Sequence, residues 1–491
     1  MNPAVLALAA GPLAGTIAGL AGMRARRCGW LAIAGALVTL ALATWLLIHE
    51  LANQRVSGFH DFVYVDPLGA FFLFTVALVV LAASVGSATY VYVEEQRGDL
   101  SHLQTRLYFV FFGLFAAFML ASMETGNLGL VFVLIEASTL ASVVLVGLEG
   151  SARSLEAAWK YVIISSLGVT IALVGTLYLF YAGSRLNLAS ELRLTWPYLL
   201  AHASQMSHPS LRLAFLLAVI GYGTKVGLAP MHTWLPDAHA EAPSPTSAML
   251  SAALLNTGMY AIIRFLAIAR AGLGPSYPRN VMLVFGFLSV AVGALFLVRS
   301  GNLKRLFAYS SVEHMGIIAI GFGFGGVLGL YGALLHTLNH AIAKCVLFLA
   351  TGDLVLAYRS KESSEVRGVL TALPVTGGAL LLGTLAVLGS PPFGPFLSEL
   401  TIVRAGFSHS PAGLAFLFLA LLVVAFVGLS RTVANSVTGQ PPDQLTGRGS
   451  RRVRVLAGAP LVAGLTGLLI LGVWIPAGLH HVLMSSIRAM S

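Results

Sequence analysis

Long uncharged apolar blocks limit most strongly how this chain can fold. They include residues 68–93, 107–122, 281–298 and 412–427. Each approaches the roughly 20 residues that a helix needs to cross about 30 Å of hydrocarbon. Lipid offers the backbone no hydrogen-bond partners, so these blocks are predicted to be helices rather than open sheet. Only 10% of the 491 residues are charged, too few to cover a water-soluble body of this size. We therefore predict an all-α membrane protein.

The hydropathy pattern predicts 14 transmembrane helices, numbered here as spans 1 to 14. Their ranges are 4–22, 30–48, 68–93, 106–123, 127–148, 158–182, 211–238, 244–268, 278–299, 303–323, 327–357, 372–409, 411–433 and 455–484. Loops and span ends after odd-numbered spans hold 18 Lys and Arg residues, and those after even-numbered spans hold nine. By the positive-inside rule, the richer set lies in the cytoplasm and both termini lie outside. The net charge of +10 therefore indicates a multi-pass membrane protein rather than nucleic-acid binding. The expected location is the inner (plasma) membrane of a bacterium or archaeon.

Two spans are interrupted in the same way. Span 7 contains Pro230, and span 12 contains Pro391 and Pro392. Proline removes a backbone donor and clashes one turn back, so each helix must kink or break. Each break falls in the fourth helix of a five-helix set, and five helices separate the breaks, which predicts two inverted repeats (spans 4–8 and 9–13). Interrupted helices at matching positions indicate an ion site near the bilayer midplane; proline kinks made only for packing are the alternative.

These boundaries divide the chain into four parts. Residues 1–105 hold the first three spans, 106–268 the first repeat, 278–433 the second repeat, and 434–491 a cytoplasmic tether with the last span. The two cysteines, Cys28 and Cys345, are too few for a disulfide framework, an iron–sulfur site or a structural zinc site. We expect no cofactor or metal bound by this chain.

Glu136 and Lys225 are ionisable groups inside predicted spans. A charge at the bilayer centre costs about 3 kcal/mol or more, so it is rare unless paired or hydrated. Glu136 lies about nine residues into span 5, hence roughly 14 Å deep, and Lys225 directly precedes the break of span 7. We expect the two to pair, so that protonating the glutamate would release the lysine. The alternatives are a glutamate satisfied by a neighbouring helix and a lysine that snorkels to the interface.

A second buried row runs through spans 10 to 12. Span 11 carries His336, His340 and Lys344 at a spacing of four, which stacks them on one helix face over about 12 Å. The other members are Glu313 and His314 in span 10 and Glu399 after the break of span 12. Because neutral histidine can both accept and donate a proton, the row is predicted to be a proton relay. His336 and His340 also match a bare zinc spacing, which is weak without an adjacent glutamate or a third ligand.

Four polar residues lie near the cytoplasmic end of broken span 7. They are His232, Asp237, His239 and Glu241. We interpret them as candidates for proton uptake from the cytoplasm. The alternative is a solvated loop with no role in transport.

Two long motifs carry a resemblance to a known family. Residues 225–243, from Lys225 to Pro243, and residues 304–316, from Lys304 to Gly316, resemble signatures of the antiporter-like subunits of respiratory complex I. Mrp-type cation/proton antiporters and membrane-bound hydrogenases belong to the same family. Segments 311–316, 338–344 and 391–394 most resemble component F of hydrogenase-4-type complexes. The resemblance implies Glu136 and Lys225 as a functional pair and Glu399 as the terminal group of the relay.

One departure from the family pattern bears on the assignment. Many complex I relatives carry a lysine or histidine in span 8 where this chain has Asn256. A relay at that point would need water or the span 11 histidines, which favours the hydrogenase branch over complex I.

The leading hypothesis is a proton-translocating subunit of a membrane oxidoreductase, either hydrogenase-4-like or complex I-like. It would hold no redox active site of its own, and nickel–iron and iron–sulfur centres would lie in partner subunits. Its expected partners are other membrane subunits, a peripheral redox arm, the lipid bilayer, and protons or sodium ions, with no nucleic acid. The alternatives are a subunit of an Mrp-type sodium/proton antiporter and a structural membrane anchor.

Overall fold

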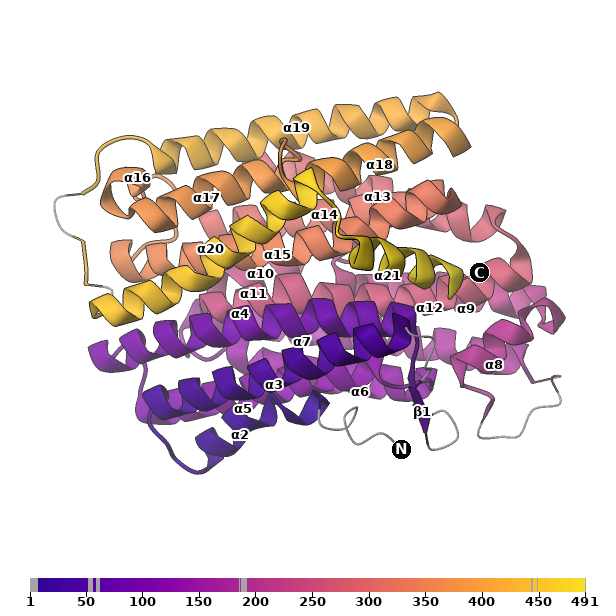
Figure 1. Ribbon diagram of the computed structural model, residues 1–491, viewed down its shortest axis with the longest axis horizontal. Helices are drawn as coiled ribbons and strands as arrows, with labels where there is room; N and C mark the ends of the chain where they lie inside the picture. The colour runs from indigo at the N-terminus through magenta and orange to yellow at the C-terminus, as the bar shows by residue number, and fades with distance from the viewer. Residues whose placement is uncertain are drawn as a thin grey trace.

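The protein is a bundle of membrane-length helices. The computed structural model describes residues 8–51, 56–58, 62–184, 186, 192–442, 445–447 and 449–490. Most helices run side by side along the longest axis, from the N-terminal ones at one edge to α19 (Ala412–Val437) at the other, and one late helix crosses them obliquely (Figure 1). Within the described residues, 11 helices are long and apolar enough to cross a membrane. The predicted all-α membrane fold is confirmed.

The N-terminal part contains three helices and a small hairpin. The elements are α2 (Leu13–Leu20), α3 (Ala25–Leu51), β1 (Val56–Gly58), β2 (Val63–Val65) and α4 (Pro67–Arg97). Strands β1 and β2 pair antiparallel, a feature the hydropathy pattern did not predict. Helix α4 begins where Asp66 caps it, since the aspartate side chain accepts from Gly69 N at 2.8 Å and Pro67 at the first position needs no donor.

The next helices form the first predicted repeat. They are α5 (His102–Met123), α6 (Leu128–Val146), α7 (Ala152–Ala182), the short α8 (Trp196–Ala201) and η2 (Ala203–Gln205), α9 (His208–Val226), α10 (Leu235–Glu241), α11 (Ser244–Met249), the π-helical turn η3 (Leu250–Leu254) and α12 (Leu255–Leu273). Span 7 is broken as predicted, because α9 ends at Val226 and α10 begins at Leu235. Gly221 of α9 lies directly against the backbone of Ala172, so α7 and α9 approach closely.

The second predicted repeat and the C-terminal helices follow. They are α13 (Ser276–Leu297), α14 (Leu303–Phe324), α15 (Gly326–Tyr358), the short α16 (Val369–Ala372), α17 (Pro374–Val387), α18 (Gly394–His409), α19, α20 (Arg451–Val473) and α21 (Ala477–Arg488). Span 12 is also broken as predicted, between α17 and α18. The exact boundaries of the two repeats and the total of 14 spans stay predictions.

The last predicted span differs from the structure. Residues 455–484 were expected to form one helix, but the chain leaves α20 after Val473 and starts α21 only at Ala477. Pro476 directly precedes α21, and proline disfavours the helical conformation in the residue before it, which accounts for the interruption. Helix α20 crosses α4 and α15 obliquely in Figure 1. The predicted start of span 1, residues 4–7, lies outside the described residues.

Buried polar residues concentrate where α14 and α15 pack against their neighbours. In the most apolar 18-residue window of each helix, 94% of the residues are buried in α14 and all of them in the helix that runs from α11 to α12, but only 17% in α20. The interior helices are therefore also those that carry the ionisable side chains of the second row.

Candidate functional site

Helix α15 presents its three titratable residues to the interior, as the spacing predicted. His336, His340 and Lys344 are all essentially inaccessible to solvent. They face α14 on one side and α18 on the other, because α15 packs against both helices.

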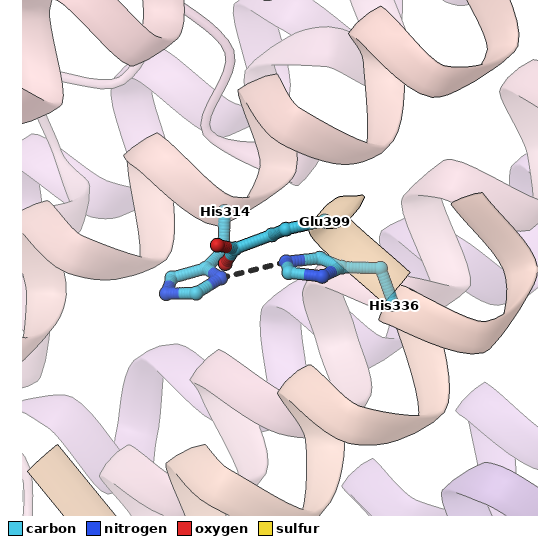
Figure 2. Close-up of side chains that lie close together, drawn as sticks. All are labelled: His314, His336 and Glu399. Atoms are coloured by element: carbon cyan, nitrogen blue, oxygen red, sulfur yellow. Dashed lines mark hydrogen bonds between the residues drawn. The ribbon is translucent and has the colours of Figure 1, made fainter. Parts of the chain in front are cut away.

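Two histidines from different helices are in direct contact. His314 Nδ1 of α14 and His336 Nε2 of α15 lie 2.8 Å apart, with their rings stacked at 5.0 Å between centroids. Figure 2 shows this pair with the carboxylate of Glu399 beside it. The structure therefore brings together three residues of the predicted relay, from spans 10, 11 and 12.

The hydrogen bonds around His336 indicate which ring nitrogens of the two histidines donate and which accept. Ser398 Oγ donates to the carbonyl of Pro395 at 2.9 Å, so it accepts from His336 Nδ1, which is also 2.9 Å away. A neutral His336 then accepts at Nε2 from His314 Nδ1. His314 Nε2 is left as a buried acceptor with no hydrogen-bond partner in the described residues.

The ring of His340 lies next to that of His314. Its centroid is 5.5 Å from that of His314, and neither of its own nitrogens has a partner within the described part of the chain. Buried polar atoms are seldom left without partners, and a water molecule is their usual companion. His340 therefore extends the row from His314 toward Lys344.

Lys344 is held by groups of α14. Its Nζ donates to Ser310 Oγ at 2.7 Å and to the carbonyl of Phe307 at 3.2 Å. Glu313 lies three residues from Ser310 along α14 and is also buried. Gly293 of α13 lies against the Cβ of Glu313, so a larger residue there would displace the glutamate.

Glu399 lies at the break between α17 and α18. Its carboxylate rests against Gly389, a residue with φ of 62°, which only glycine adopts readily. One ligand-type atom each of His314, His336 and Glu399 lies within 4.8 Å of the others. That donor set has the composition of a metal site, but its two histidine nitrogens are already hydrogen-bonded to one another.

The end of α20 covers the same break. Gly472 lies directly on the carbonyl of Pro392, and a side chain at that position would meet the backbone of the break. Helix α20, for which no functional role was predicted, therefore packs on the backbone of the break that precedes Glu399.

Glu136 and Lys225 do not form the direct ion pair that was expected. Lys225 is fully buried, and its Nζ lies 3.5 Å from the hydroxyl of Tyr161 and 4.9 Å from that ring's centroid. Tyr161 in turn shares a 2.7 Å hydrogen bond with Ser142, on the helix that carries Glu136. The carboxylate of Glu136 accepts from Ser166 at 2.6 Å. Each charge is therefore held by a hydroxyl group of α7, which carries both Tyr161 and Ser166.

The four candidates for proton uptake separate into two kinds. Asp237 and Glu241 lie near the surface in ion pairs: Asp237 with Lys160 and Arg305, and Glu241 with Lys361 at 3.1 Å. His232 and His239 are buried, so the alternative of a solvated loop does not hold for the histidines, and a role of the four residues in proton uptake stays a prediction. His239 packs between Trp234 and Phe348, and neither of its ring nitrogens has a partner among the described residues.

Asn256 occupies span 8 directly after a π-helical turn. Its amide nitrogen donates to the carbonyl of Ala252 at 2.8 Å, and its oxygen is buried without a partner in the described structure. In the preceding turn, Ser251 shares a 2.7 Å hydrogen bond with Ser311 of α14. A π-turn often marks a functional position, and here a hydroxyl bridge between Ser251 and Ser311 joins the helices of the two predicted repeats close to Asn256.

Comparisons with known proteins agree on one family. Residues 125–425 match the family described as the NADH:quinone oxidoreductase/Mrp antiporter transmembrane region. The hydrogenase-4 component F homolog of Methylacidiphilum infernorum is 35% identical over 77% of this chain and 84% of its own length. NADH-quinone oxidoreductase subunit N of Desulforudis audaxviator is 33% identical over 79% of this chain and 74% of its own.

Solved structures show the same fold. A chain of the Mrp complex from Dietzia superposes with a TM-score of 0.85 at 20% identity, over all of this chain and 97% of that one. The resemblance stated from the sequence motifs is confirmed.

Proposed function

Because this chain belongs to the NADH:quinone oxidoreductase/Mrp antiporter transmembrane family, we propose that it moves protons across the membrane as an antiporter-like subunit of a hydrogenase-4-like oxidoreductase complex. The similarity to a hydrogenase-4 component F homolog, at 35% identity, supports the hydrogenase branch. In this proposal the termini lie outside the cytoplasm, as the basic loops predict.

The observation that carries the proposal is the buried contact of His314 with His336 beside Glu399 (Figure 2). Groups that can each hold or release a proton come from three helices and meet inside a membrane protein. Buried ionisable residues are costly in this setting and usually mark an ion pathway. A purely structural anchor would be served better by apolar side chains at these positions.

Protons would enter the row through Lys344 and leave it through Glu399. The ammonium of Lys344 is already hydrogen-bonded to Ser310, and His340 and His314 offer unpartnered nitrogens between the two ends. A proton arriving at His314 Nε2 would make His314 a cation and strengthen its bond to His336. Release to Glu399 would restore the neutral pair.

Glu136 and Lys225, in the first predicted repeat, would control when a proton moves along the second row. Protonation of Glu136 would remove the negative charge that favours an ammonium at Lys225, and Tyr161 and Ser142 would carry the effect between them. Electron transfer in a peripheral arm formed by partner subunits would shift the protonation equilibrium of Glu136. Nickel–iron and iron–sulfur centres would belong to the partner subunits, and this chain would contribute only acid–base groups.

The proposal is tested by proton pumping in the assembled complex reconstituted in vesicles. The variants Glu136→Gln, Lys225→Ala and His336→Gln should each lower the pumping rate by about a hundredfold, the loss typical of a positioned acid–base group. Glu156→Gln is the matched control, because Glu156 is an exposed carboxylate on α7 that pairs with Lys160. Full pumping in His336→Gln would end the proposal.

A sodium/proton antiporter subunit of the Mrp kind is the competing function. The structural similarity to the Mrp complex shows only the shared fold. Subunits that co-purify in mild detergent separate the two cases, since iron–sulfur proteins should accompany only the oxidoreductase.

A further inference from the structure

A large groove lies on the lipid-facing side of the molecule, away from the relay. It has a volume of about 940 Å³ and is bounded by α3, α4 and α20. That volume is at the upper end of the range of about 300–1,000 Å³ for small-molecule sites. The groove exists because α20 crosses α4 obliquely rather than lying along it (Figure 1).

One end of the groove is strongly basic. Arg26 near the start of α3 and Arg451 and Arg452 at the start of α20 all line it. No acidic side chain lines the groove in the part of the chain that the structure describes. The positive end of the α20 dipole points to the same place. An anion is the complementary ligand.

The rest of the groove is apolar. Leu456 and Ala459 of α20 and Ala88 of α4 form its walls, and Ala459 lies roughly 12 Å along the helix from Arg451. Trp30 and Tyr92 also line the groove, and these are the side chains that membrane proteins place at the level of lipid headgroups. A ligand with an anionic head and an acyl tail would match both halves.

The basic end also lies where such a ligand is most abundant. The starts of α3 and α20 and the end of α4 lie at the same end of the molecule (Figure 1). The arginine count assigns that end to the cytoplasmic side, and anionic lipids there attract arginines close to the membrane surface.

We propose that this groove binds one anionic glycerophospholipid, with its phosphate on Arg26, Arg451 and Arg452 and its acyl chain along α20. The bound lipid fills the groove beneath α20. Because the far end of α20 rests on the α17–α18 break through Gly472, the lipid also holds the helix that covers that break.

The test measures lipids retained by the full-length chain. The chain is purified in mild detergent with equal amounts of phosphatidylglycerol and phosphatidylcholine, and the bound lipids are counted by native mass spectrometry. The wild type should keep one phosphatidylglycerol in preference to phosphatidylcholine. Each arginine-to-alanine change should weaken that preference about fivefold, and the three together about a hundredfold.

Two further variants keep the test decisive. The triple variant Arg24→Ala, Arg27→Ala, Arg431→Ala removes the same charge from exposed positions outside the groove, and it should retain the lipid. Ala459→Trp fills the groove and leaves the arginines in place, so it should lose the lipid without any change of charge. Equal retention by all variants would overturn the proposal. So would a cross-link showing that a neighbouring subunit occupies the groove at Trp30 in the assembled complex.

Discussion

The ion pair between Asp66 and Arg264 allows the sharpest prediction about stability. Arg264 of α12 is 1% exposed, and it donates to both carboxylate oxygens of Asp66, one of them at 2.8 Å. Its guanidinium also stacks over Trp196 at 3.8 Å from the ring centroid and donates to the hydroxyl of Tyr260 at 3.1 Å. This one side chain therefore ties the start of α4 to the first predicted repeat.

Removing only the arginine should cost more than removing the pair. Arg264→Met leaves a buried carboxylate without its partner, which costs about 3–5 kcal/mol of unfolding free energy. Asp66→Asn leaves the arginine unpaired at similar cost, but an asparagine still caps α4, so the helix start is preserved. The double variant should lose clearly less than the sum of the singles, because neither charge is then left alone.

Unfolding of the purified chain in detergent measures the three variants against the wild type. We expect a coupling free energy of about 2 kcal/mol or more between the two positions. Additive losses in the double variant would show that the two side chains stabilise the fold independently, and the reasoning would be refuted.

Three other changes have defined outcomes. Burial raises the pKa of Glu124, between α5 and α6, to about 8. The raised pKa stabilises the folded state at pH values below the ordinary pKa of glutamate, and this stabilisation is lost as the pH rises toward 8. Glu124→Gln should therefore melt like the wild type at pH 4 and be more stable at pH 9, by up to about 5 kcal/mol at 1.4 kcal/mol per pKa unit. Gly472→Ala should destabilise the chain by about 1–3 kcal/mol because its side chain meets the backbone of the break, whereas Gly467→Ala, which meets no atom within 4 Å, should be neutral in the same thermal assay. Tyr161→Phe should cost only about 1 kcal/mol of stability yet slow proton pumping at least tenfold, since it removes the hydroxyl beside Lys225.

Most of the fold could be predicted because lipid leaves the backbone so few choices. Apolar length determined where the helices lie, and proline chemistry located both breaks, at Pro230 and at Pro391. The end of the last span was mispredicted because Trp474 and Ile475 are apolar enough to continue a hydropathy window. Only the approach of Pro476 signals that the helix cannot continue there. The β1–β2 hairpin was missed because three-residue strands leave no periodic pattern to recognise.

The site could be predicted only as a set of titratable groups. Helical spacing placed His336, His340 and Lys344 on one face, and that face does point inward. Spacing within one helix cannot show which residue of another helix it meets, so the contact of His336 with His314 required the structure. Ser398 was missed for the same reason: a serine carries no signal until its hydroxyl is seen holding a histidine nitrogen.

The separation of Glu136 from Lys225 changes how the two charges would communicate. A direct ion pair would have to break before either group could move a proton. Here each charge is hydrogen-bonded to a hydroxyl of α7, Lys225 to Tyr161 and Glu136 to Ser166, so a change of charge at either residue would not have to break a salt bridge. The second row has the same character, since Lys344 is held by Ser310 and His336 by Ser398. Neutral hydroxyls can reverse the direction in which they donate, so under the proposed function these contacts would let each row reset after a proton has passed.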